Sequence, residues 1–85
     1  MIDKKQWYSA NPLRAWRAKQ KSPLTQMDVA YKIGVSRQTA ADWEKGGVQP
    51  SGDNLLKLAG MLSMKPRELR RKWARWYDSR SKVEV

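Results

Sequence analysis

Two short helical segments meet at a single glycine in the stretch TQMDVAYKIGVSRQTAADWEKG, residues 25–46. Three apolar residues share one face of the first segment: Val29, Ala30 and Ile33. Gly34 supplies a left-handed C-cap for this segment, and Ser36 is placed to cap the next one, residues 37–45. So short a turn forces the two helices to cross, and the rest of the chain must pack around that corner.

Three more segments have the spacing of short amphipathic helices. Asn11 and Pro12 fit the cap and first position of one, and KSPL at 21–24 ends it. Residues 53–62 and 66–77 carry leucines and aromatic residues at helical spacing. No segment reads as a strand, so the sequence predicts an all-α fold of five helices.

The organisation expected from these segments is a single domain. An N-terminal basic arm, residues 1–10, precedes a domain at 11–77 whose last helix serves dimerisation. A flexible polar tail, residues 78–85, follows it. The final VEV allows a strand across a dimer as an alternative to disorder.

Composition excludes several classes of function. The chain of 85 residues has no cysteine and no histidine, so the usual zinc sites and histidine-based acid–base catalysis are absent. No glycine-rich phosphate loop is present, and caps, dipoles or ion pairs explain most of the carboxylates. We therefore expect no enzyme activity, no catalytic residue, no metal and no cofactor.

The charge balance indicates the partner. Eighteen Lys and Arg oppose eight Asp and Glu, giving a net charge of +10, which favours a polyanion such as nucleic acid. No apolar run approaches the length of a membrane span, and the N-terminus lacks the apolar core of a secretory signal. The expectation is a cytoplasmic bacterial protein, associated with the nucleoid when bound, with no membrane partner.

The stretch from Leu24 to Leu62 resembles the Cro and cI phage-repressor type (XRE-type) of helix-turn-helix family. Seven features match in register: Gln26, Ala30, Gly34, Glu44, Gly46, Pro50 and the leucine-rich run 55–62. The resemblance implies a five-helix lambda-repressor-like DNA-binding domain whose second and third helices form the helix-turn-helix. Two departures are Ala40 with Trp43, a volume exchange at core positions, and a linker after Arg17 that is about two residues longer.

The head of the third helix carries side chains suited to reading bases in a major groove. Arg37 fits guanine, Gln38 fits adenine or contacts guanine, and Ala41 fits a thymine methyl. Asp42 either accepts from cytosine or holds Arg37 or another base-facing side chain in place. The expected phosphate contacts are Gln26, Ser36, Thr39 and Lys45. The resemblance also implies a structural ion pair between Arg17 and Glu44.

The last helix has a wide apolar stripe. We expect part of it to form a dimer interface: Leu69, Trp73, Trp76 and Tyr77. Packing is favoured over base stacking for the tryptophans on apolar faces, whereas Trp7 and Tyr8 are left ambiguous. The run RELRRKWAR reads as a solvated face, with a second nucleic-acid patch or a membrane-binding helix as alternatives.

The resulting hypothesis is a sequence-specific transcriptional repressor of the phage or plasmid type. It would bind double-stranded DNA through the major groove as a homodimer on an inverted repeat, with no small-molecule effector. One alternative is an antitoxin or regulatory partner whose main surface binds a protein. The other is a non-specific nucleic-acid binder.

Overall fold

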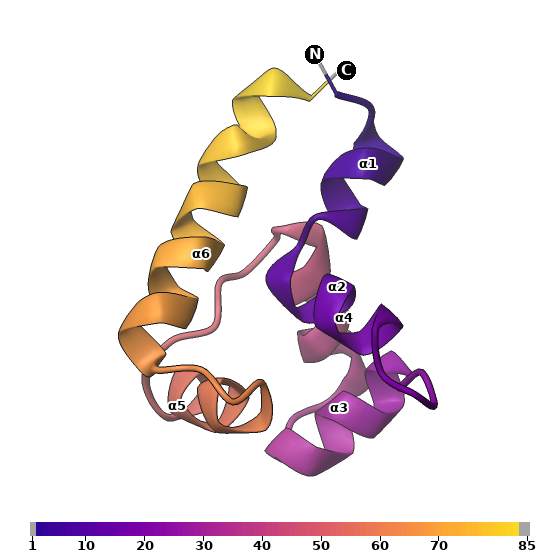
Figure 1. Ribbon diagram of the computed structural model, residues 1–85, viewed down its shortest axis with the longest axis vertical. Helices are drawn as coiled ribbons and strands as arrows, with labels where there is room; N and C mark the ends of the chain where they lie inside the picture. The colour runs from indigo at the N-terminus through magenta and orange to yellow at the C-terminus, as the bar shows by residue number, and fades with distance from the viewer. Residues whose placement is uncertain (1, 84–85) are drawn as a thin grey trace.

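The computed structural model describes residues 2–83, and the predicted all-α class is confirmed (Figure 1). Its helices are α1 (Lys4–Ser9), α2 (Pro12–Ala18), α3 (Gln26–Ile33), α4 (Arg37–Lys45), α5 (Gly52–Met61), α6 (Pro66–Asp78) and a 3₁₀ helix (Ser79–Lys82). Within residues 2–83, the extended pairing consists of one isolated parallel bridge between Ile2 and Val83. Helices α3 and α4 are the two segments that the sequence places around Gly34.

Local side-chain hydrogen bonds explain where the helices begin. The Asn11 side chain accepts from the backbone N–H groups of Leu13 and Arg14, at 2.9 and 3.0 Å, and so caps α2. The Ser36 hydroxyl accepts from the backbone N–H of Thr39 at 3.1 Å and caps α4. These caps satisfy donors that a helix leaves unpaired in its first turn.

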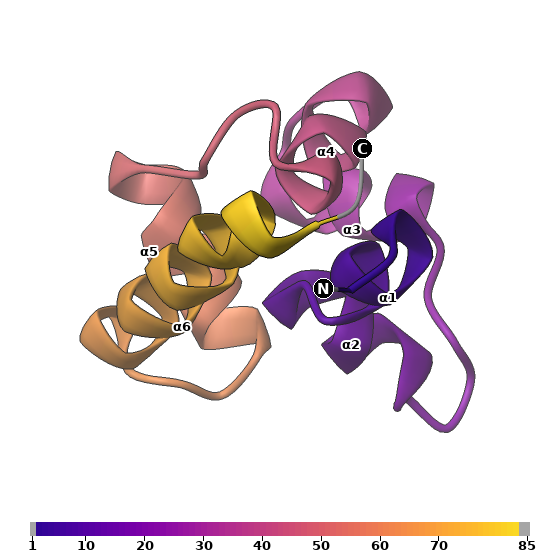
Figure 2. The same cartoon turned by 90° about the horizontal axis from the view of Figure 1, so that it is seen from above.

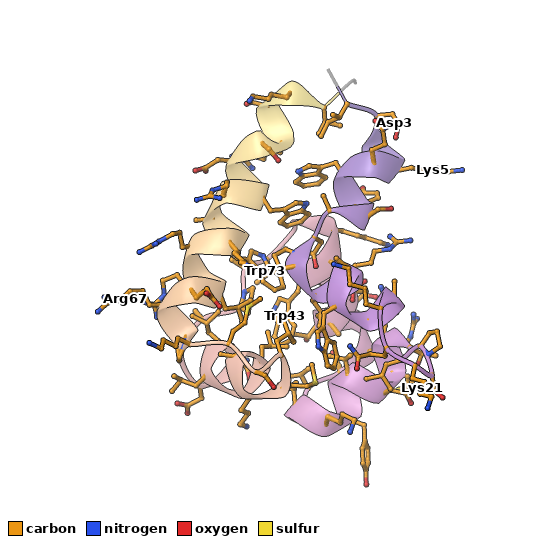
Figure 3. All side chains as sticks on the ribbon, in the orientation of Figure 1. Asp3, Lys5, Lys21, Trp43, Arg67 and Trp73 are labelled. Carbon is orange, nitrogen blue, oxygen red and sulfur yellow. The ribbon has the colours of Figure 1, made fainter. Side chains whose placement is uncertain are left out.

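The core is a compact layer of leucines and indoles between α6 and the helices α2 to α5. Figure 3 shows the side chains of Trp43 and Trp73 inside the molecule, with Arg67 directed outward from α6. Trp43 is 1% exposed and Ala40 is fully buried. Positions 40 and 43 therefore both face the core, as the sequence predicts, and the exchange of volume between them stays a prediction.

The N-terminal residues form a sixth helix instead of the basic arm that the sequence predicted. Asp3 caps α1 through a capping box with Gln6, and Trp7 is buried on its inner face. The Trp7 ring stacks on the Trp76 ring, with centroids 4.3 Å apart and planes 10° apart. Burial of the Trp7 ring thus stabilises a helix in the segment that the sequence predicted to be a basic arm.

The tail also departs from the expectation of flexibility. Asp78 ends α6, residues 79–82 continue as the 3₁₀ helix, and Val83 packs against the core. The Ile2 backbone N–H donates to the Lys82 carbonyl at 3.1 Å, so both ends of the described chain meet. Residues 84–85, the rest of the VEV segment, lie outside the described residues.

The expected dimer stripe on the last helix requires correction. Leu69, Trp73 and Trp76 are 0%, 2% and 5% exposed, because helices of the same chain already cover them. Tyr77 is half-buried, and the guanidinium of Arg80 lies over its ring. The stripe is wide because it closes the core against α1 as well as α5, so Leu69, Trp73 and Trp76 are not available to a second copy.

The two tryptophans of α6 differ in their hydrogen bonding. Trp76 Nε1 donates to the Trp7 carbonyl at 2.7 Å, and Trp7 Nε1 returns a bond to the Trp76 carbonyl at 3.0 Å. Trp73 Nε1 is buried without an acceptor among the described residues. The indole N–H therefore stabilises the fold at position 76 and carries a desolvation cost at position 73.

We predict that Trp76→Phe will lower the free energy of unfolding by about 1–2 kcal/mol more than Trp73→Phe. The two changes remove the same volume from core positions, and only the first removes a hydrogen bond. Urea denaturation followed by circular dichroism measures the difference. Equal losses for the two variants would contradict the assignment.

Candidate nucleic-acid interface

The corner between α3 and α4 is built from small residues and one left-handed turn. Gly34 adopts φ of +88°, and the backbone N–H groups of Gly34 and Val35 both donate to the Ala30 carbonyl. Ala30 and Ala40 are almost completely buried, which lets the two helices cross closely. This geometry fixes the direction of α4 relative to the rest of the domain.

The exposed head of α4 presents polar side chains to solvent. Arg37 and Gln38 are exposed, and Gln38 Nε2 donates to Asp42 Oδ1 at 2.9 Å. Asp42 is half-buried, so its carboxylate orients the Gln38 amide one helical turn away. Of the expected base-reading set, Arg37 and Gln38 are exposed, and Asp42 is half-buried and bonded to Gln38.

Ala41 is a correction to that set. It is 5% exposed, although it lies outside the connected hydrophobic core. A methyl group covered by protein atoms cannot contact a thymine methyl, so Ala41 is removed from the base-reading set. The sequence pattern misplaced it because two consecutive alanines straddle the boundary between the faces of a short helix.

The expected phosphate-contacting residues lie in three places: at the start of α3, at the start of α4 and at the end of α4. Gln26 is the first residue of α3 and is half-buried, and its Nε2 donates to Glu44 Oε1 at 3.2 Å. Ser36 and Thr39 share a hydrogen bond of 2.9 Å at the start of α4. Lys45 is exposed at the end of α4. The Gln26 amide is thus held by the protein and keeps its oxygen for a further donor.

The carboxylate of Glu44 lies at the centre of the contacts behind α4. It is 1% exposed, and both of its oxygens accept from Arg17, each at 2.7 Å. Arg17 also donates to the Leu24 carbonyl at 2.7 Å, while Gln26 adds the third bond to Glu44. The structure thus brings Arg17 and Glu44 together as the resemblance implies, joining α2, α3 and α4.

Three further residues support the end of α4 and were not assigned that role from the sequence. Asn11 is fully buried, and its Nδ2 donates to the Trp43 carbonyl at 3.3 Å. The Trp7 and Trp76 rings lie against Gly46, where an added Cβ would come within 2.7 Å of Trp7. The tight approach and the φ of +79° both require glycine there. The sequence predicts that Asn11 caps α2, but the hydrogen bond from Asn11 to the Trp43 carbonyl depends on tertiary packing.

Hydrogen bonding shifts the pKa of two groups near this interface. The bonds to Glu44 raise the pKa of Arg17 above its ordinary value, and burial opposes them in part. The Thr25 backbone N–H and hydroxyl lower the pKa of Asp28 in the capping box of α3. Because the pKa of Asp28 is lower in the folded state, this cap stabilises α3 at neutral pH. The stabilisation is lost as the pH falls through the lowered value.

The polar groups of this interface are mainly hydrogen-bond donors and cations. Among the described residues, no cluster of three acidic side chains could hold a metal ion. None of the helices within residues 2–83 is both long and apolar enough to cross a bilayer. The N-terminal end of α4 carries polar side chains, and contacts with α2 and α3 fix the position of this helix. This is the geometry of a small DNA-binding domain.

Comparisons with known proteins agree with this class. A helix-turn-helix family model matches residues 13–69, and the chain therefore belongs to that helix-turn-helix family of DNA-binding transcriptional regulators. An uncharacterized helix-turn-helix-type transcriptional regulator of Methanocaldococcus jannaschii is 44% identical over 55 residues, covering 65% of this chain and 80% of the relative. No solved structure matches the chain with comparable significance.

We predict that Arg17→Met will destabilise the fold by about 3–5 kcal/mol, because it leaves the Glu44 carboxylate buried with one amide donor. Glu44→Gln should cost less, about 2 kcal/mol, because Arg17 has a side-chain exposure of 16% and keeps access to water. Urea denaturation measures both.

The double variant Arg17→Met with Glu44→Met is the control for this pair. It removes both charges, and we expect it to recover at least half of the loss caused by Arg17→Met. A double variant less stable than either single variant would show that the pair is strongly stabilising in itself.

Proposed function

We propose that the protein is a sequence-specific transcriptional repressor that inserts the head of α4 into a major groove of duplex DNA. The observation that carries this proposal is the exposed face of Arg37, Gln38 and Asp42 on a helix braced by the buried Glu44. Arg37 would pair with guanine, and the Gln38 amide, held by Asp42, would pair with adenine. Occlusion of promoter DNA is the simplest mode of repression for a domain of this size.

Phosphate contacts would set the orientation of α4 on the duplex. Gln26 presents its amide at the N-terminus of α3, where backbone N–H groups and the helix dipole favour an anion. Ser36, Thr39 and Lys45 add contacts at either end of α4. These contacts position the protein, whereas discrimination between sequences would come from Arg37 and Gln38.

We propose a homodimer whose interface differs from the stripe expected on α6. Two large aliphatic residues remain exposed after α4 in the chain: Val48 in the following loop at 54%, and Leu56 on α5 at 55%. Exposed aliphatic side chains that follow the reading helix in the chain suit a two-fold contact that sets the spacing of two helices on an inverted repeat.

Selection of bound sites from random duplexes tests the proposed function directly. We predict an inverted repeat with half-sites about one helical turn apart. Arg37→Ala should relax base preference at one position in each half-site, with a loss of about 1–3 kcal/mol at that base pair. The readout is the binding of a panel of duplexes that carry single substitutions.

Lys45→Ala is the matched control, since it also removes one exposed cation at α4. It should weaken binding to all duplexes alike and reduce the salt slope by about 0.9. A selected site bound no better than random duplex would leave non-specific nucleic-acid binding as the function. A uniform loss for Arg37→Ala would remove its base-reading role.

We predict that Leu56→Glu will raise the dimer dissociation constant at least about tenfold, because it places a charge in an apolar contact. Sedimentation equilibrium measures the dissociation constant. Met27→Glu is the matched control, since Met27 is 56% exposed and lies on α3. An equal effect of the two changes would place the dimer contact elsewhere.

A further inference from the structure

The excess positive charge lies outside the helix-turn-helix. Residues 25–48 contain three cations and three anions, so their net charge is zero. Residues 1–24 carry a net charge of +5, and residues 66–82 carry another +5. The two most basic parts of the chain are therefore the helices that flank the proposed DNA-reading elements, and their charge needs an explanation of its own.

These two basic parts meet along a groove between α2 and α6. The groove has a volume of about 530 Å³, and much of its lining is apolar, with Pro12, Ala15 and Trp16 on one wall and Met64 on the other. A hollow of this size takes up two or three apolar side chains of a partner. Trp16 is half-buried on the groove wall and keeps part of its ring available for contact.

Cations border the groove on both sides. Lys19 follows α2, whereas Lys72 and Arg75 lie one turn apart on α6, and all three are exposed. No acidic residue lines this groove. Within residues 2–83 the salt bridge of Arg17 with Glu44 is the one ion pair, so these three cations have no carboxylate partner there.

We infer that this groove binds an acidic amphipathic helix of a partner protein. Large apolar side chains at helical spacing would enter the groove, and Asp or Glu residues flanking that stripe would meet Lys19 on one side and Lys72 with Arg75 on the other. Single-stranded nucleic acid fits less well, because successive bases stack on several open rings, whereas Trp76 is 5% exposed and the half-buried Trp16 is the one other aromatic ring in the groove lining.

The groove is separate from the proposed DNA contacts. None of its lining residues belongs to α3 or α4. Helix α2, seen from above in Figure 2, meets α4 at the Arg17–Glu44 ion pair near the C-terminal end of α4, whereas Arg37 and Gln38 lie at the N-terminal end of that helix. A partner in the groove would leave the head of α4 free, so the protein could hold DNA and a second protein at the same time.

Selection from a displayed library of random 16-residue peptides on the full chain tests this inference. We expect enriched peptides to carry apolar residues at positions i, i+3 or i+4, and i+7, with Asp or Glu beside them. A fluorescein-labelled enriched peptide then serves as the probe in anisotropy titrations, with a scrambled peptide of the same composition as its control.

Two sets of variants separate the groove from general electrostatics. Lys72→Glu with Arg75→Glu should weaken the probe at least about tenfold, and Ala15→Leu should weaken it by filling the groove without a change in charge. Arg67→Glu with Arg70→Glu makes the same charge change on exposed positions of α6 outside the groove. It should change binding less than about threefold.

Four results would overturn the inference. They are enrichment of peptides without acidic residues or without helical spacing, equal binding of the scrambled probe, equal losses for the two double variants, and no enrichment at all. A competitor that displaces the probe at a lower concentration than unlabelled peptide would be the occupant of the groove instead. The two competitors tested are a second, unlabelled copy of the chain and a single-stranded oligonucleotide. None of these results depends on binding to duplex DNA.

Discussion

The position of α4 depends on the buried contact between the Glu44 carboxylate and the Arg17 guanidinium. Glu44 projects from α4 itself and receives hydrogen bonds from α2 and from the first residue of α3. This one carboxylate therefore fixes the relative positions of α2, α3 and α4, next to the proposed phosphate contact at Gln26. A bidentate arginine suits this task better than lysine, because its planar fork fixes direction as well as distance. Gln26 takes part in this contact and in the proposed phosphate site, which links the orientation of α4 to the backbone of the duplex.

A second support for α4 comes from aromatic packing at the same, C-terminal end of the helix. Trp43 fills the core beneath the helix, while the stacked Trp7 and Trp76 rings close over Gly46. A chain of 85 residues has a small core, and large rings with hydrogen-bonded N–H groups bury much surface for each residue ordered. The polar pair and the aromatic pair thus hold α4 from two directions and leave its outer face free.

Much of this arrangement could be read from local patterns. The caps at Asn11 and Ser36, the turn at Gly34 and the inward direction of Trp43 all follow from spacing and side-chain chemistry. The errors share one cause, which is that burial depends on what packs from elsewhere in the chain. The segment around Trp7 has the composition of a basic arm, and its order comes from a partner 69 residues away. The stripe at Trp73 and Trp76 is too wide for the predicted five helices, and the missing helix α1 accounts for its width. At positions 40 and 41 both alanines are buried, whereas the helical pattern of so short a segment assigned only Ala40 to the inner face.

The meeting of Ile2 with Val83 has a consequence for engineering the chain. Because the Ile2 N–H bonds to the Lys82 carbonyl and Val83 pairs beside it, a short Gly-rich linker could join the two ends without disturbing α1 or α6. New ends could then be opened in the exposed connection between α2 and α3, around Lys21 to Pro23. Before such a cut, the closed backbone circle would restrict the unfolded chain, and the lower entropy of the unfolded state would raise the melting temperature. The permuted form would leave the outer face of α4 untouched.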